Sequence, residues 1–161
     1  MGILDVGLAL QAVPLHRLSS TARECRLKPE SCKRSGLRTA EKLTHHGTAV
    51  ANLIVGDGPV GNGPRAIITR AEGALKTPQL ASAAARMTEG SERPDIVNLS
   101  IGCERRTPDC ADYNPLALKE LTRQSITVLA AGNDYPEPAF EMVAALDSIK
   151  VGSLAPNGLI S

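Results

Sequence analysis

The sequence predicts an α/β fold in which a parallel sheet is covered by helices on both faces. Short apolar runs alternate with helix-like segments along the chain, and this alternation is typical of parallel strands joined by helical crossovers. The predicted strands are residues 2–8, 66–75, 95–101, 126–131 and 149–154. The predicted helices are residues 46–55, 78–87 and 115–124.

The helices are predicted from their apolar spacing and their first residues. Residues 46–55 carry apolar side chains at helical spacing on one face. Thr77 is an N-cap residue followed by Pro78 at the first helical position, and Asn114 caps the last helix. Residues 14–44 are polar, basic and rich in loop-forming residues, and we expect a surface loop insert there.

Length and composition limit the class of protein. The 161 residues fit one domain, and 42% hydrophobic with 22% charged residues exclude a disordered, charge-rich tail. Eighteen Lys and Arg against 17 Asp and Glu give a net charge of +1, which argues against nucleic acid as the main partner. Residues 23–42 are basic but lack the interleaved aromatic residues of single-strand binding. No apolar run approaches the roughly 20 residues that span a bilayer.

One glycine-rich segment matches a nucleotide-binding motif in sequence but not in its predicted structural context. Gly56, Gly58 and Gly61 fit G-x-G-x-x-G, which binds dinucleotides when it follows a strand and opens a helix. Here it follows a helical segment and precedes a strand. The reversed order favours a tight helix-to-strand connection over a nucleotide site.

Four polar residues fall where a parallel sheet forms its ligand crevice. Asp5 follows the apolar stretch of the first strand, Ser100 ends the third strand, and Asn133 follows the fourth. The carboxyl ends of parallel strands share one edge of the sheet. His46 opens a helix that faces the same edge. An aspartate that fixes a histidine tautomer, a histidine base and an amide donor together suit acyl transfer.

Each of these residues also has a structural interpretation. Asp5 is a common type of turn or cap residue, and Asn133 in Gly-Asn-Asp is an ordinary turn former. His46 before Gly-Thr is compatible with a helix terminus that has no chemical role. Only their joint placement favours a catalytic site.

The chain resembles the subtilisin-like serine proteases, the subtilase or peptidase S8 family. The similarity runs in order through ILDVGL, HHGTAVANLI, NGPRAIITRAEGAL, DIVNLSIG, ITVLAAGND and IKVGSLAPNGLIS. It covers nearly all of residues 1–161 apart from the basic insert. The most specific combination is HGT-x-VA between an upstream Asp-x-Gly strand and a downstream strand that ends in AAGN.

The resemblance implies a role for each matching position. Asp5 matches the triad aspartate, His46 the general base and Asn133 the oxyanion-hole amide. Residues 100–102 match the edge strand that pairs with a bound peptide. The substrate-binding residues are therefore Ser100, Ile101 and Gly102. The family implies a peptide or protein substrate.

The nucleophile of the family has no counterpart in this chain. The catalytic serine of the family lies in a Gly-Thr-Ser motif that opens a later helix, and no such motif occurs in residues 1–161. Asp5 and His46 then have no hydroxyl to activate. We expect a partial peptidase domain that ends before its serine and is inactive alone. The alternatives are a non-catalytic peptide-binding module of the same fold and an unrelated α/β binding domain.

The four cysteines form two pairs, each enclosing six residues of turn-like sequence. The spacing predicts local disulfides Cys25–Cys32 and Cys103–Cys110, with four free thiols as the alternative. Disulfides favour a secreted or periplasmic location. Residues 1–10 nevertheless lack the basic segment and cleavage site of a signal peptide, so a cytoplasmic location stays open.

No cofactor is identified from the residues, and none of them indicates a metal site. Calcium is frequent in the family, but no acidic cluster in this sequence identifies a site for it. Membrane association is not expected. The sequence does not specify an oligomeric state or a cleavage preference.

Overall fold

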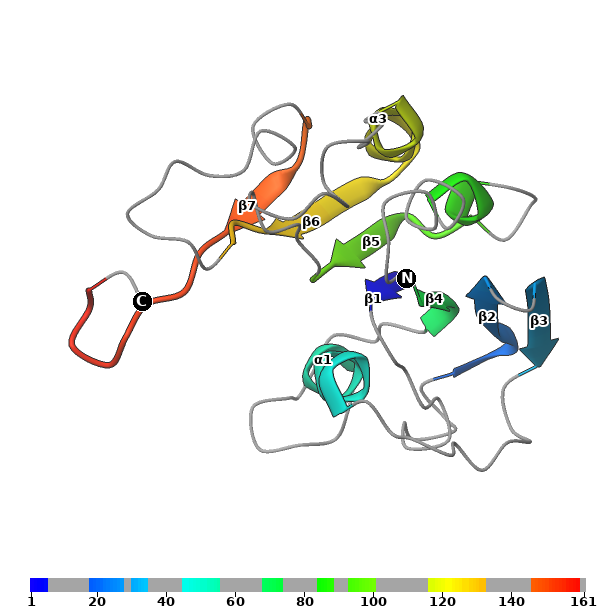
Figure 1. Cartoon of the computed structure of the whole chain (residues 1–161), viewed down its shortest axis with the longest axis horizontal. Helices are drawn as coiled ribbons and strands as arrows, with labels where there is room; N and C mark the ends of the chain where they lie inside the picture. Colours follow the sequence, from blue (N-terminus) through cyan, green and yellow to red (C-terminus); the bar gives the residue numbers. More distant parts are fainter. Residues whose placement is uncertain are drawn as a thin grey trace.

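The structure is a computed structural model of the whole chain. It describes residues 1–5, 18–27, 30–34, 45–55, 68–73, 84–88, 93–100, 116–132 and 146–159. Within these ranges the chain forms one seven-stranded sheet with helices on both sides (Figure 1). The predicted α/β class is therefore confirmed.

The strands lie in the order β3-β2-β4-β1-β5-β6-β7. In chain order they are β1 (Gly2–Asp5), β2 (Leu18–Leu27), β3 (Glu30–Arg34), β4 (Ile68–Gly73), β5 (Ile96–Leu99), β6 (Ile126–Ala130) and β7 (Ile149–Val151). All neighbouring pairs are parallel except β2 and β3. All five strands predicted from the sequence are present, each shorter than its predicted range. Parts of those ranges lie outside the described residues.

The prediction of a loop over residues 14–44 is wrong for residues 18–27 and 30–34, which form strands. β2 and β3 form an antiparallel pair, and β2 also extends the sheet beside β4. Charged residues are common on edge strands, where they discourage pairing with other chains. The basic composition therefore marks a sheet edge here, although it is also typical of a loop.

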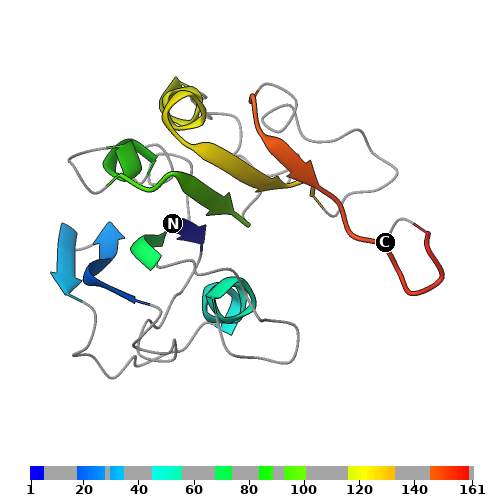
Figure 2. The same cartoon turned by 180° about the vertical axis from the view of Figure 1, so that it is seen from behind.

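The helices divide between the two faces of the sheet. α1 (His45–Val55) lies on one side and packs against β1. α3 (Leu116–Gln124) lies on the opposite side and packs against β6, and a helical turn at residues 84–88 shares that side (Figures 1 and 2). All three predicted helices are confirmed, the second only for its described part. No helix in the described ranges is long and apolar enough to cross a membrane.

The face of the sheet toward α3 contains most of the described core. Val97, Leu99 and Leu129 are fully buried and alternate along β5 and β6 with more exposed residues. α3 covers them with buried Leu118 and Leu121. This alternation is the strand period of two, in which successive side chains point to opposite faces.

The start of β1 is tightly enclosed on that same face. A Cβ atom added to Gly2 would lie 2.9 Å from Cγ of Pro94 and 3.0 Å from Sδ of Met87. Only glycine therefore lets the strand lie this close to the 84–88 turn. Burial lowers the pKa of the Met1 α-amino group below its usual value, and the Asp95 carboxylate opposes this shift.

Candidate active site

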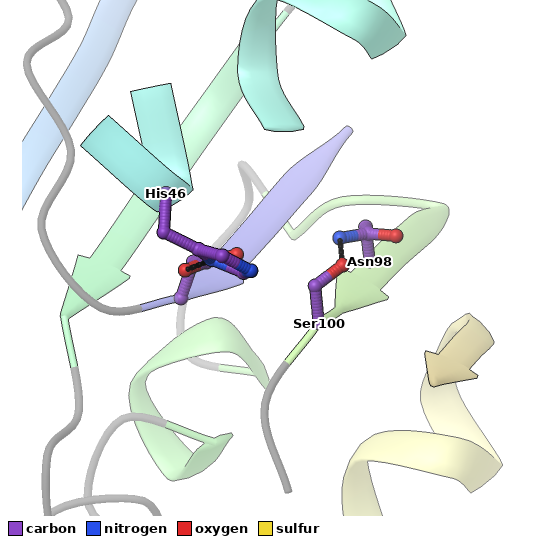
Figure 3. Close-up of polar contacts among 4 residues, drawn as sticks. His46, Asn98 and Ser100 are labelled. Carbon is purple, nitrogen blue, oxygen red and sulfur yellow. Dashed lines mark hydrogen bonds and ion pairs between the residues drawn. The ribbon is translucent and has the colours of Figure 1, made fainter. Parts of the chain in front are cut away.

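Asp5 and His46 meet at the carboxyl end of β1. Asp5 is the last residue of β1 and is 1% exposed, and His46 lies in the first turn of α1. The His46 Nδ1 atom lies 2.7 Å from Oδ1 of Asp5 (Figure 3). The sequence analysis predicted this juxtaposition from residues 41 positions apart.

This contact orients the histidine for proton transfer. A carboxylate only accepts hydrogen bonds, so Nδ1 carries a hydrogen and donates a hydrogen bond to Oδ1 of Asp5. In the neutral ring that assignment leaves Nε2 as an acceptor, the form in which histidine acts as a general base. The His46 side chain is 57% exposed, so the ring is open to an approaching molecule.

Small residues on the inner face of α1 bring the histidine to this position. Gly47 is buried and Ala51 is fully buried, four residues further along the helix. Residues four apart lie on the same face of a helix. Their small side chains leave room for α1 to pack against β1. The first turn of α1 can then place His46 over Asp5.

A second polar contact lies on the neighbouring strand. Asn98 Nδ2 donates a hydrogen bond to Ser100 Oγ over 2.8 Å, and both residues are half-buried. The β1–β5 register pairs Ile3 with Asn98, so Asn98 shares a sheet face with Ile3 and Asp5. Figure 3 shows Asn98 and Ser100 on the β5 side of His46. The Ser100 hydroxyl accepts from Asn98, which leaves its own hydrogen available for another acceptor.

Ser100 was predicted at the site, but Asn98 was not. The sequence signal was available, because residues two apart on a strand share a face. Asn98 therefore had to lie on the same side as Ser100 once residues 95–101 were assigned to a strand.

Several predicted site residues fall outside the described ranges. They are Asn133, Ile101, Gly102, Cys103 and Cys110. The described chain reaches Gly132, whose φ of 101° lies in a region that favours glycine. The Ala131 amide donates to the Val151 carbonyl over 2.9 Å, which fixes the end of β6 just before Gly132.

The cysteines of the basic hairpin are aligned by the backbone. Cys25 on β2 lies directly opposite Cys32 on β3. Opposed residues in antiparallel strands have Cα atoms about 4.5–5.5 Å apart, within the range that a disulfide spans. The backbone register is compatible with the predicted Cys25–Cys32 disulfide, which stays a prediction.

Among the described residues no group of three or more His, Cys, Asp or Glu side chains is placed to hold a metal ion. The described polar residues at this edge of the sheet are Asp5, His46, Asn98 and Ser100. These residues supply an oriented base and a hydroxyl donor at the edge of the sheet.

The structure thus has an α/β sheet with a buried aspartate in contact with a histidine at the carboxyl end of β1. Such an arrangement is compatible with general-base chemistry. Comparison with protein families is more specific. The model of the subtilase family, Peptidase_S8, matches residues 2–160, and this chain belongs to that family. At the level of the family this is a serine protease. No curated protein matches the chain.

Proposed function

We propose that this chain is the Asp–His part of a subtilisin-like serine endopeptidase that hydrolyses peptide bonds. The observation that carries this proposal is the 2.7 Å contact between His46 Nδ1 and Asp5 Oδ1. In the proposed mechanism Asp5 holds the tautomer of His46 and stabilises the imidazolium that forms. His46 Nε2 takes the proton of a serine hydroxyl and later gives it to the leaving amine.

The attacking serine has to come from sequence beyond residues 1–161, because these residues contain no Gly-Thr-Ser motif. Asn133 is proposed as the side-chain donor to the oxyanion. Residues 100–102 are proposed to pair with the backbone of the peptide substrate as an added strand. We further propose an oxidising, extracytoplasmic location, in keeping with the predicted disulfides.

A fluorophosphonate probe tests the proposal, because it labels only an activated serine. A protein that continues the reading frame to a Gly-Thr-Ser motif should label, and His46→Ala should abolish the labelling. His45→Ala is the matched control, since His45 precedes the motif and should leave labelling unchanged. Residues 1–161 alone should not label. A reading frame with no such motif, or labelling that survives His46→Ala, would contradict the proposal.

The second candidate is a non-catalytic peptide-binding module. The observation that favours it is the hydrogen bond between Asn98 and Ser100 on β5, beside the residues proposed to pair with a peptide. Isothermal titration with extended peptides separates the two candidates. Binding that is retained in His46→Ala, in a protein without a labelled serine, would support the module.

A further inference from the structure

Three arginines occupy one row across one edge of the sheet. The register pairs Arg34 on β3 with Arg23 on β2, and Arg23 with Arg70 on β4. The three strands are neighbours in the sheet (Figures 1 and 2). Neighbouring strands lie about 4.8 Å apart, so the three Cα atoms fall within about 10 Å. We call these three residues the arginine row.

The arginine row and the candidate active site lie on opposite faces of the sheet. Residues in register on parallel strands share a face, and Arg70 pairs with Gly2 on β1. A Cβ atom added to Gly2 would meet Met87, so this is the face of the helical turn at residues 84–88. Asp5 is three residues further along β1 and therefore belongs to the other face, where it contacts α1. The row is thus separate from the Asp–His pair.

The pairing of β2 with β4 is irregular where it brings two of these arginines together. Leu18 pairs with Ile68, so regular pairing would place Ser20 beside Arg70. The register shifts between Leu18 and Arg23, and Arg23 takes that position instead. Irregularities of this kind are over-represented at sheet edges and next to functional sites. With regular pairing the row would contain one arginine fewer at its centre.

The arginine row is unfavourable unless an anion balances it. Like charges directly opposite each other on neighbouring strands destabilise a sheet, and arginine is always charged. The next row on the same face is Cys32, Cys25 and Glu72, which contributes one carboxylate. Glu30 is a further row away, about 13 Å along β3 from the arginine. The arginine row and the row beside it therefore have two positive charges in excess, which is the charge of a phosphate or sulfate dianion.

We propose that the arginine row binds a tetrahedral oxyanion, a phosphate or sulfate group. Guanidinium groups suit this ligand because each presents a planar fork of N–H donors to two oxygens of one anion. The ligand is a single dianion, because the row spans only about 10 Å. This inference goes beyond the proposed function, since it holds whether or not Asp5 and His46 take part in catalysis.

Two substitutions on one strand test the proposal. Arg23→Gln removes the central charge of the row. Arg26→Gln is the matched control, because it removes the same charge from β2 on the other face, where Arg26 pairs with Gly73. Each protein is titrated with inorganic phosphate by isothermal titration calorimetry. Sodium chloride keeps the ionic strength constant, so that general screening does not contribute to the difference.

The unmodified chain should bind one phosphate. Arg23→Gln should raise the Kd at least about tenfold, because it removes charge-assisted hydrogen bonds, and Arg26→Gln should change it less than about twofold. Urea unfolding shows that the variants are folded. In chloride alone, Arg23→Gln should raise the midpoint, because it relieves repulsion within the row. Phosphate should raise the midpoint of the unmodified chain and of Arg26→Gln, but not that of Arg23→Gln.

Three probes that share the tetrahedral group identify its source. They are inorganic phosphate, inorganic sulfate and a phosphoserine peptide. The second pKa of a phosphate ester is about 6, so binding of both phosphates should weaken below pH 6 while binding of sulfate persists. A peptide that binds tighter than inorganic phosphate would assign the row to a phosphorylated polypeptide. Equal affinities would assign it to the free anion, and both results support the proposal.

Three results would overturn the proposal. One is the absence of binding by all three probes. Another is a Kd for phosphate that Arg23→Gln leaves unchanged. The third is equal weakening by Arg23→Gln and Arg26→Gln, which would indicate attraction to net charge and not to the row. Loss of fluorophosphonate labelling in His46→Ala bears only on the catalytic proposal, so the two can fail separately.

Discussion

The sheet face on which α1 packs has two unlike halves. At β1 it is covered by α1 and buried, and we call this the covered half; at β6 and β7 it exposes apolar side chains, and we call this the open half. Under α1, Ile3 and Asp5 are buried, and the carboxylate orients His46. On β6 and β7, the same face exposes Ile126 and Ile149. In the described residues α1 packs against β1 on this face, whereas α3 packs against β6 from the opposite side. A helix that covers a strand end provides the enclosed carboxylate that an oriented base requires.

The largest effect is expected at the contact between Asp5 and His46, if the proposed function holds. In a protein that includes the serine, Asp5→Asn should lower the rate of fluorophosphonate labelling about 10⁴-fold, because the amide no longer enforces the Nδ1–H tautomer of His46. Asp147→Asn changes an exposed carboxylate and is the control. Equal rates for Asp5→Asn and the unmodified protein would show that the buried carboxylate does not orient the base.

The packing difference can be measured with the same truncation in both halves. Ile3→Ala should lower the free energy of unfolding by about 2–5 kcal/mol, because it leaves a cavity beneath α1. Ile126→Ala removes an exposed side chain and should cost less than about 1 kcal/mol. Urea unfolding followed by circular dichroism gives both values. Similar losses for the two variants would mean that Ile126 on β6 is also covered in solution.

We expect a disulfide to join β2 and β3 at the edge of the sheet beyond β4. Reducing Cys25–Cys32 should lower the free energy of unfolding by about 2–3 kcal/mol, because the bond restricts a short loop in the unfolded chain. Peptide mapping without reduction should find this pair joined, with Cys25→Ser/Cys32→Ser as the reference protein. Free thiols, or a pairing with Cys103 or Cys110, would contradict the prediction.

The end of β6 in the open half depends on backbone conformation. Gly132→Ala should destabilise the fold by about 1–3 kcal/mol, because φ is 101° and alanine is strained there even though no atom lies within 4 Å of an added Cβ. Gly152→Ala is the control, because an added Cβ there also meets no atom and φ is not positive. Thermal unfolding distinguishes the two, and equal midpoints would contradict the expected strain.

The smallest effect concerns the first residue of the covered half. Burial lowers the pKa of the Met1 α-amino group, with Asp95 opposing the shift. The unfolded chain therefore binds more protons than the folded one just below pH 8, and stability should rise as pH increases through that window. Acetylation of the amine should remove this dependence. If stability instead fell over this pH range, and acetylation removed the fall, the effect of Asp95 would outweigh the effect of burial.

Much of the fold follows from local pattern. The apolar run before Asp5 and the helical spacing after His46 predict the two elements that form the site, and the resemblance predicts their contact. The basic hairpin was missed because its charges are equally typical of loops. Its strands are defined by pairing with β4 and with each other, which no local window contains.

The site was predictable to the extent that its residues end strands or begin helices. Asp5, His46 and Ser100 were found for that reason. Asn98 lies inside a strand, and its relevance depends on the register that places it on the same face as Ile3. Its place beside Ser100 follows from the strand period of two, whereas its place on the face of Asp5 depends on pairing across the sheet.

The packing of α1 on β1, in which Gly47 and Ala51 are buried, also affects how long the Asp5–His46 contact persists. The Asp5–His46 contact exists only while this helix packs on β1, so any local opening that moves α1 away separates the two residues although the sheet remains intact. The lifetime of the contact is therefore limited by the lifetime of the packing between this eleven-residue helix and β1. Hydrogen exchange of the α1 amides would report how often α1 opens and His46 leaves Asp5.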